Sequence, residues 1–536
     1  MRPRATPLLL LAAAAALAAS SLRASRAHPF PIYDEAATLE LSREFSREGG
    51  GAAQVAAYLS GRCREDNRHP LYSMLSAPFM DGTIFDFARA KLVSLACALA
   101  LLAAVFWSCR EIWGEGVALA AAAAVALMPE TAGLSQEAAA DILFAALYAA
   151  AVFLPETLGE GPAAWGAFGA LAGLAYLAKG DGHFLLLAAL VASLRRGRSR
   201  RQARVLPALA GFFATAGFLL ARNLRVWGDP FHNVNSKVFW LDAWPQFRRL
   251  SWTPQWREVG PLWYARTHTA AQALARLGAG AVAAGDDLVR TLSLPTLGAW
   301  GERLCGALVA AAAALGAREC LRRGRRGLVL RAVVPGAALF AAFSWYAPVA
   351  ENPRFLYPVA VVVVVLAAVG AAALYERRQA AAPNLPRLAR AALAGLGLWA
   401  ALALARGGDP LRWAGVPADW AGASRAVAGR RYLIDDWSLY TNWDAGADTA
   451  EPYAMDAPQD EVRAFARARG LSAGVVDMHV WTLHARRDLY GRADALGPTT
   501  MLGWPRCFPP PGGRGKFLVF ARACAPAQRE GARSAR

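Results

Sequence analysis

The sequence predicts an all-α polytopic membrane protein with a small C-terminal α/β domain outside the membrane. Hydrophobic residues make up 56% of the 536 residues and charged residues only 18%, a balance that is unusual for a soluble globular protein. The apolar residues also fall in blocks that approach the roughly 20 residues needed to cross a bilayer as a helix. These blocks cover residues 92–107, 117–128, 142–154, 184–194, 206–221, 332–345 and 356–374.

The net charge of +18 lies mainly between the apolar blocks. Its arginines form three clusters, and positively charged loops of membrane proteins stay on the cytoplasmic side. We therefore interpret the charge as an orientation signal and expect no nucleic-acid partner. The clusters contain Arg195, Arg196, Arg198, Arg200, Arg201 and Arg204; Arg318, Arg322, Arg323, Arg325, Arg326 and Arg331; and Arg377, Arg378, Arg387 and Arg390.

A topology that keeps all three clusters in the cytoplasm contains about eleven spanning helices. The first span, near residues 6–22, is a membrane anchor or a cleaved signal peptide, and the last lies near residues 391–405. The N-terminus is then cytoplasmic and the C-terminus outside, in a multi-pass protein that we expect in the plasma (inner) membrane. Residues 1–405 would form the membrane domain, with outer loops over about 26–90 and 222–298.

Residues 406–536 are expected to form the outer α/β domain. Their patterns predict short strands at 431–435, 474–477 and 516–521 and a helix at 461–469. A disulfide between Cys507 and Cys524 would suit an oxidising outer compartment.

The predicted outer segment from residue 222 to residue 300 is rich in tryptophan. Tryptophans at this density are typical of a membrane interface, and they predict an amphipathic helix lying there at about 262–277. Stacking of one tryptophan on a carbohydrate is the alternative. The residues are Trp227, Trp240, Trp244, Trp252, Trp256 and Trp263.

Asp34 and Glu35 follow the first span by a few residues and open a predicted helix. A carboxylate at this position can have a purely structural role, because acidic residues cap and stabilise the first turn of a helix. In the functional interpretation, one carboxylate accepts the proton of a hydroxyl group that attacks a sugar.

Three cations are predicted near the outer membrane surface, where a charge is costly and usually functional or paired. Lys179 and Arg222 end two spans, and Arg354 lies in a short turn between two others. We expect them to stabilise a phosphate leaving group, with Arg354 and Arg222 the stronger candidates because an arginine can bind a phosphate through two donors. For Arg354, snorkelling or an ion pair with Glu351 is the alternative.

Asp141 and His69 are supporting candidates. Asp141 opens a span, where it either orients one of the cations or caps its helix, and His69 is more typical of a loop or an interface. No local ligand spacing supports a metal site formed by these residues with Asp34 and Glu35, so no metal or other cofactor is predicted. The glycines of residues 161–182 lack a nucleotide-binding pattern, so an activated donor would have to come from the membrane.

In this order, the motifs resemble the GT-C superfamily of membrane glycosyltransferases, and especially glycosyltransferase family 39, the branch of protein O-mannosyltransferases and lipid A aminoarabinose transferases. The resemblance covers about residues 5–375. The matching motifs are Asp34 with Glu35, His69 to Tyr72, Asp141, Ala178 to Gly180, Arg222 with Asn223, Gly228 to Phe231, and Arg354 to Pro358.

The resemblance implies a polyprenyl-phosphate donor of a hexose or pentose, inversion at the anomeric carbon, and Asp34 as the catalytic base. The acceptor would be a hydroxyl group of a lipid, glycan or protein. Two other classes stay open: a transporter or flippase of a lipid-linked substrate, which would favour paired halves with broken spans, and a noncatalytic membrane scaffold.

Overall fold

A computed structural model gives the fold. It describes residues 5–27, 34–63, 65, 67–81, 86–159, 161–194, 198–250, 253–292, 298–350, 352–378, 432–435, 450–453, 459–468, 470–477, 493–494, 497–498, 500–508 and 517–521. The chain forms two compact units. The first contains residues 1–28, 42–242 and 260–412, and the second contains residues 29–41, 243–259 and 413–536.

Helices account for nearly all described residues up to Arg378. The first half contains α1 (Ala5–Ala27), α2 (Asp34–Arg47), α3 (Gly51–Ser60), α4 (Leu71–Ser76), η1 (Ala77–Phe79), α5 (Asp86–Trp113), α6 (Glu115–Leu127), α7 (Pro129–Leu134), α8 (Asp141–Thr157), α9 (Pro162–Ala178), η2 (Gly180–Phe184) and α10 (Leu185–Leu194). The second half contains α11 (Arg198–Trp227), α12 (Asn235–Val238), α13 (Trp244–Leu250), η3 (Pro254–Arg257), α14 (Pro261–Thr267), α15 (Ala270–Thr291), α16 (Gly298–Arg322), α17 (Arg326–Tyr346), η4 (Pro353–Phe355) and α18 (Tyr357–Arg378).

The predicted membrane-spanning blocks are helices wherever the structure describes them. Among the described residues, five helical stretches are long and apolar enough to cross a membrane, namely Asp86–Trp113, Arg204–Trp227, Trp300–Arg322, Arg326–Tyr346 and Tyr357–Glu376. Shorter apolar helices cover Pro7–Arg23, Glu115–Leu127, Pro162–Ala178 and Gly180–Val191. The predicted last span at 391–405 and the predicted domain boundary at 405 lie outside the described residues.

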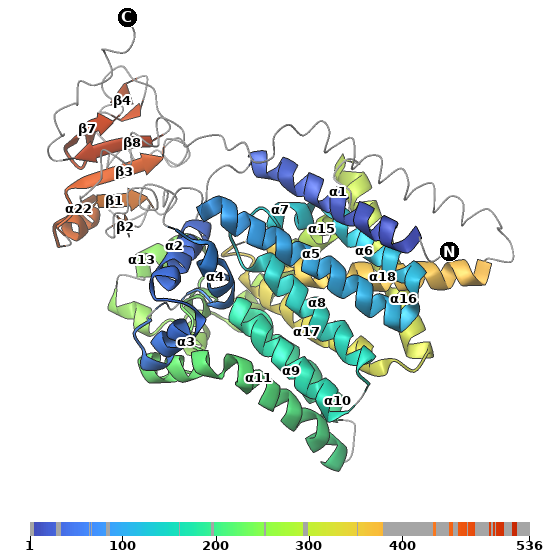
Figure 1. The fold of residues 1–536 in the computed structure, drawn as a ribbon. Coiled ribbons are helices and arrows are strands. Elements are labelled where there is room, and N and C mark those ends of the chain that lie inside the picture. Colours follow the sequence, from blue (N-terminus) through green and yellow to red (C-terminus); the bar gives the residue numbers. More distant parts are fainter. Residues whose placement is uncertain are drawn as a thin grey trace, which may run out of the picture. The chain divides into compact units, whose positions relative to one another are not determined.

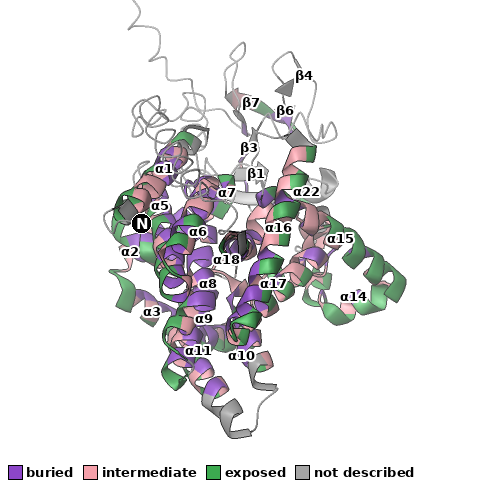
Figure 2. Cartoon of the chain, turned by 90° about the vertical axis from the view of Figure 1, so that its right-hand side faces the viewer, coloured by how far each residue is buried: buried purple, intermediate pink, exposed green. Residues whose placement is uncertain are grey.

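Helix α8 lies at the centre of the first unit. It packs against α5 and α9, and α9 in turn packs against α11 (Figure 1). In Figure 2, α8 is coloured as buried along most of its length, whereas α14 and the first half of α15 are largely exposed. An apolar helix that is buried on all sides needs neighbours all round it, which explains why α8 is surrounded by the other apolar helices.

Glycines allow pairs of helices to approach closely. A Cβ atom at Gly169 of α9 would overlap the carbonyl oxygen of Ala208 on α11, and one at Gly370 of α18 would overlap that of Ala312 on α16. Gly280 of α15 meets the carbonyl oxygen of Ser344 on α17 in the same way. Small residues at such crossings are typical of membrane helices, because backbone packing replaces the hydrophobic effect as the force between them.

Arginines of the first two predicted cytoplasmic clusters meet at one end of the bundle. The guanidinium carbons of Arg204 and Arg331 lie 5.3 and 5.9 Å from the centre of the Trp165 ring. Glu156 near the end of α8 receives an ion pair from Arg331 at 2.6 Å and another from Arg325 at 3.3 Å. Arg204, Arg325 and Arg331 therefore lie at the end of the bundle that carries Glu156, as the predicted topology requires.

The C-terminal part of the second unit is a small α/β domain, as predicted. Its six-stranded sheet has the order β2-β1-β3-β8-β7-β6, in which β1 is parallel to β2 and β3 and the other pairs are antiparallel. The elements are β1 (Tyr432–Asp435), β2 (Ala450–Tyr453), α22 (Gln459–Ala468), β3 (Ala473–Asp477), β6 (Thr500–Met501), β7 (Trp504–Phe508) and β8 (Phe517–Ala521), with a separate pair β4 (Ala493–Asp494) and β5 (Gly497–Pro498).

Cysteine usage agrees with the sequence pattern. Cys507 on β7 is part of a disulfide, whereas Cys63, Cys97, Cys109, Cys305 and Cys320 are free. The predicted partner of Cys507, Cys524, lies outside the described residues.

The prediction of one amphipathic helix over residues 262–277 is wrong in one respect, because two helices, α14 and α15, cover this segment. α14 ends before His268, whose backbone is extended, and α15 begins directly after its N-cap residue, Thr269. The Thr269 hydroxyl accepts a hydrogen bond from the Gln272 amide, and the Gln272 side chain accepts one from the Thr269 amide. This reciprocal cap ends one helix and starts the next, a local signal that hydrophobic periodicity alone does not reveal.

We expect Gly169→Ala to destabilise the protein by about 1–3 kcal/mol, because the added methyl group forces α9 away from the backbone of α11. Thermal unfolding of the purified protein in detergent measures the effect. Gly217→Ala on α11 is the matched control, since a Cβ atom there meets nothing within 4 Å. Equal melting temperatures for the two variants would contradict the close packing.

Candidate functional site

A carboxylate at the start of α8 binds two cations from separate parts of the chain. Asp141 Oδ1 lies 2.6 Å from Lys179 Nζ, and Asp141 Oδ2 lies 4.0 Å from Arg354 Nη1. Lys179 follows the last residue of α9, and Arg354 lies in η4 between α17 and α18. The structure thus brings together three of the residues singled out in the sequence, and Asp141 holds both cations rather than one.

The local sequence explains why both cations are fixed. The backbone of Lys179 leaves the helical region with φ −153° and ψ 137°, so its side chain departs from the line of α9. The Asn352 side chain accepts a hydrogen bond of 3.0 Å from the Arg354 amide and so caps η4. Short, capped turns of this kind hold a side chain more precisely than a long loop would.

An aromatic ring lies below the two cations. Lys179 Nζ lies 4.9 Å and the Arg354 guanidinium carbon 5.4 Å from the centre of the Phe355 ring. The Phe355 ring is itself stacked on Phe343 at 4.7 Å and 6°. Cation–π contacts stabilise charges in a poorly hydrated site, so this ring supports a concentrated positive charge at the ends of the helices.

His69 has a packing role next to this cluster. Its ring meets that of Tyr176 edge-on at 4.9 Å, and its Nε2 lies 3.3 Å from Asn233 Nδ2. A Cβ atom at Gly180 would come within 3.0 Å of the same Nε2, which explains a glycine directly after Lys179. Burial lowers the pKa of His69 to about 3, so the ring stays uncharged at neutral pH.

Arg222 is a buried side chain of the first unit. Its side chain is only 2% exposed, its Nη1 donates a hydrogen bond of 2.5 Å to the Glu65 carbonyl oxygen, and its guanidinium carbon lies 5.0 Å from the centre of the Tyr58 ring. In this conformation Arg222 holds the segment after α3 against α11. Its expected role in binding a phosphate stays a prediction.

Asp34 and Glu35 form the first turn of α2 and belong to the second unit. Asp34 is exposed, whereas Glu35 is 3% exposed. Later in the same helix, Arg43 Nε donates to Asp86 Oδ2 at 2.6 Å, which ties the end of α2 to the start of α5. The two carboxylates therefore differ in access to solvent although they are adjacent in sequence.

Lys91 is a charged residue that the sequence reasoning missed. It lies within α5, is 3% exposed, and places Nζ 4.2 Å from the centre of the Phe87 ring. The available signal was a lysine directly before the apolar block that begins at Leu92, because a charge inside a spanning helix is costly and usually has a function.

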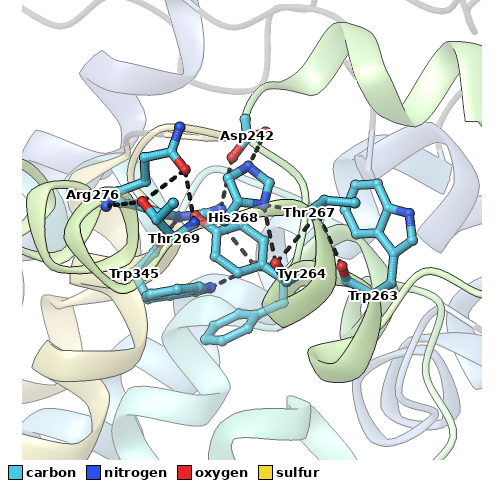
Figure 3. Close-up of polar contacts among 10 residues, drawn as sticks. Asp242, Trp263, Tyr264, Thr267, His268, Thr269, Arg276 and Trp345 are labelled. Carbon is cyan, nitrogen blue, oxygen red and sulfur yellow. Dashed lines mark hydrogen bonds and ion pairs between the residues drawn. The ribbon is translucent and has the colours of Figure 1, made fainter.

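The tryptophan-rich segment is held by a second polar cluster around Asp242 (Figure 3). Asp242 contacts His268 Nε2 at 3.1 Å and Arg276 Nη1 at 3.4 Å, and the His268 ring is stacked on Tyr264 at 3.9 Å. The guanidinium carbon of Arg276 lies 4.5 Å from the centre of the Trp345 ring. Several of these aromatic rings thus serve packing within the first unit, where they join α14 and α15 to α17.

Among the described residues, no three His, Cys, Asp or Glu side chains gather in an arrangement that could hold a metal ion. The expectation that the protein needs no metal stays a prediction.

Comparison with known proteins gives the fold a wider context. Residues 70–221, which include Asp141 and Lys179, match the family model described as dolichyl-phosphate-mannose-protein mannosyltransferase. A search of curated proteins found no match. The structure is similar to ArnT from Cupriavidus metallidurans bound to undecaprenyl phosphate, with a TM-score of 0.56 and 14% identity over 97% of this chain and 100% of that one.

Two archaeal structures are also similar. The oligosaccharyltransferase of Archaeoglobus fulgidus tethered to an acceptor peptide gives a TM-score of 0.53 at 14% identity, over 92% of this chain and 74% of that one. The oligosaccharyltransferase AglB of the same organism, in complex with an inhibitory peptide and a dolichol-phosphate, gives 0.51 at 14%, over 91% and 72%.

The chain has the GT-C fold. The resemblance predicted from the order of the sequence motifs is thereby confirmed, together with the fold class of a helical membrane protein that carries a small C-terminal α/β domain. Within this GT-C fold, the shared carboxylate of Asp141 joins the start of one helix to the end of another and to the turn before α18.

We expect Asp141→Asn to lower the free energy of unfolding by about 1–3 kcal/mol, because Lys179 and Arg354 lose their common counter-charge at a largely buried position. Thermal unfolding in detergent measures the change. Glu111→Gln removes an exposed carboxylate of α5 and serves as the control. An unchanged melting temperature for Asp141→Asn would show that the ion pairs do not stabilise the bundle.

The pH dependence of the melting temperature tests whether His69 is buried in its uncharged form. His69 lies between α3 and α4, outside the apolar blocks. Its folded pKa of about 3 is below its ordinary value of 6.5, so the unfolded chain binds a proton that the folded chain excludes. The contribution of His69 to the free energy of unfolding is therefore largest above about pH 6.5 and decreases as the pH falls toward 3. The melting temperature should drop less between pH 7 and pH 4 in His69→Gln than in the wild type.

The wild type, measured over the same pH range, provides the reference for that experiment. Parallel curves for His69→Gln and the wild type would contradict a buried, uncharged His69.

Proposed function

We propose that this protein transfers a sugar from a polyprenyl-phosphate donor to a hydroxyl group of an acceptor on the extracytoplasmic side of the membrane, with inversion at the anomeric carbon. The observation that carries the proposal is the cluster of Asp141, Lys179 and Arg354 at the helix ends. Two cations, Lys179 and Arg354, share the Asp141 carboxylate there.

A pair of cations suits the leaving group of this reaction. A phosphate departs as a stable anion, so it needs cationic compensation more than it needs an acid. The side chains of Lys179 and Arg354 are 22% and 25% exposed, which leaves both of them access to a ligand. ArnT bound to undecaprenyl phosphate and AglB in complex with a dolichol-phosphate are structures of this fold, which supports a lipid phosphate as donor.

Asp34 is the proposed catalytic base. The acceptor oxygen forms a bond to the anomeric carbon while its proton passes to the Asp34 carboxylate, and the bond between that carbon and the phosphate oxygen breaks with its electron pair on the phosphate. The proton later leaves Asp34 for solvent. The exposure of Asp34 favours it over the buried Glu35, since a base must reach the acceptor.

The proposed orientation places the N-terminus in the cytoplasm and the C-terminal domain outside the plasma membrane. The meeting of Arg204 and Arg331 at Trp165 supports it, because one arginine from each of two predicted cytoplasmic clusters then lies at the same end of the bundle. The disulfide of Cys507 supports an oxidising compartment for the C-terminal domain. The acceptor in this proposal is a lipid, glycan or protein hydroxyl, and the reaction uses no metal ion.

We expect Asp34→Asn to reduce transfer by about 100-fold or more, because it removes the base with little change in volume. Membranes containing the wild type or the variant are incubated with a panel of labelled polyprenyl-phosphate sugars, and movement of label to a new product is measured. Glu40→Gln, which removes an exposed carboxylate from the same helix, should keep most of the activity.

A measurement of donor binding distinguishes the role of the base from the role of the cations. Asp34→Asn should bind the donor as the wild type does, whereas Arg354→Ala should weaken binding about tenfold or more by removing a charged donor of hydrogen bonds. Full transfer by Asp34→Asn would move the role of base to Glu35 or another carboxylate. No transfer from any donor by the wild type would overturn the proposal in favour of a transporter or a scaffold.

A further inference from the structure

The reaction scheme does not use a group of aromatic side chains, two of which flank Lys179 in the sequence. The ring of Tyr176, at the end of α9, meets the rings of His183 in η2 and Phe231 in the loop after α11 at 6.3 and 6.1 Å. The rings of His183 and Phe231 lie 6.4 Å apart. Three aromatic side chains from two distant parts of the sequence thus form one surface, and His183 follows Lys179 by only four residues.

Two of these rings are open to solvent although the third is buried. Phe231 is 50% exposed and His183 is exposed, whereas Tyr176 is 3% exposed and lies behind them. A phenylalanine this open loses the stabilisation that burial would give. The buried tyrosine fixes the positions of the two exposed rings from below.

The loop that carries Phe231 is held in place by hydrogen bonds. The buried Asn223 side chain donates to the carbonyl oxygens of Pro230 and His232, each at 3.1 Å. Asp229 Oδ1 accepts a hydrogen bond of 2.9 Å from the Phe231 amide. The exposed ring is therefore presented by a braced turn, and a site held in this way loses little entropy when a ligand binds.

The hydrogen bonding of His183 determines what its free nitrogen can do. Its Nδ1 lies 2.6 Å from the Gly180 carbonyl oxygen. A carbonyl oxygen can only accept a hydrogen bond, so Nδ1 carries the hydrogen. In the uncharged ring, Nε2 then has a lone pair, and this exposed side chain offers an acceptor beside the apolar face of Phe231.

We propose that Phe231 and His183 form the subsite for the sugar ring of the lipid-linked donor. The C–H face of a pyranose packs on an aromatic ring, and its hydroxyl groups donate hydrogen bonds to an acceptor such as Nε2. Lys179 binds the phosphate at one end of η2, and His183 reads a hydroxyl group at the other end. This inference rests on the proposed function, because the donor class comes from there.

The same chemistry would recognise a sugar of a glycan acceptor. The donor is favoured because η2, which carries His183, directly follows Lys179 in the chain, and the partner of Lys179, Asp141, also binds Arg354. A sugar ester-linked to the phosphate held by these cations has its ring within a few ångströms of them, whereas an acceptor sugar approaches from the opposite face in a reaction with inversion.

The test measures equilibrium binding to the full-length protein in lipid nanodiscs, without acceptor. The probes are undecaprenyl-phosphate esters of glucose, mannose and 4-aminoarabinose, and bare undecaprenyl phosphate. Phe231→Ala should lower the affinity for the ester that binds best by about tenfold and leave the affinity for the bare lipid within about twofold. Phe79→Ala, a change at another exposed phenylalanine (55%), should alter neither affinity.

His183 is tested by a pair of variants. His183→Leu should lower the affinity for the same ester by about fivefold to tenfold, because it removes the hydrogen-bond acceptor. His183→Gln should restore most of that affinity, since its amide oxygen reaches the position of Nε2. A merely structural role would not distinguish the two variants in this way.

Each result decides between the alternatives. If every ester bound to Phe231→Ala and His183→Leu as it binds to the wild type, the proposed sugar subsite would be overturned. If these variants bound every ester normally but transferred sugar poorly, the two rings would be assigned to the acceptor site. Equal losses for the esters and the bare lipid in Phe231→Ala would overturn it in favour of a contact with the bilayer or the lipid chain. If the wild type bound neither bare lipid nor ester, the proposed function would fail as well.

Discussion

A charge inside an apolar helix bundle is stable only at a helix end or against an opposite charge, and α8 shows how this protein satisfies both conditions. Its first residue, Asp141, binds Lys179 and Arg354, and Glu156 near its last turn binds Arg325 and Arg331. The two carboxylates are separated by about 22 Å of apolar helix, at 1.5 Å per residue. The middle of the bundle can therefore exclude water, while charged side chains collect at the two ends of α8. Asp141, Lys179 and Arg354 lie at one end, and Glu156, Arg325 and Arg331 lie at the other.

Close helix packing sets the positions of these ends. At Gly169, Gly280 and Gly370 a Cβ atom would overlap a neighbouring backbone, so the helix spacing there depends on the missing side chain. Such spacing brings the end of α9 and the turn before α18 within reach of one carboxylate. The polar cluster thus depends on residues that carry no chemistry, and a methyl group far from it can shift the distances between its charges.

The region around Lys179 combines three properties that a lipid-linked sugar requires. Lys179 and Arg354 supply positive charge for a phosphate, the uncharged His69 packs against Gly180 without adding another charge, and the exposed rings of His183 and Phe231 offer an apolar face with a hydrogen-bond acceptor. η2, a single turn of helix, connects Lys179 of the proposed phosphate site to His183 of the proposed sugar subsite. A change in η2 could consequently alter sugar preference without altering affinity for the lipid phosphate.

The sequence by itself determined the apolar helices and several short strands of the C-terminal domain, because these depend on local composition and periodicity. It also identified Lys179, Asp141 and Arg354 as costly charges at span ends. Only the tertiary structure decided which charges meet: Asp141 holds both cations, whereas Arg222 is buried against a backbone carbonyl. Pairing between residues distant in the chain depends on how helices cross, and neither hydropathy nor motif order encodes that crossing.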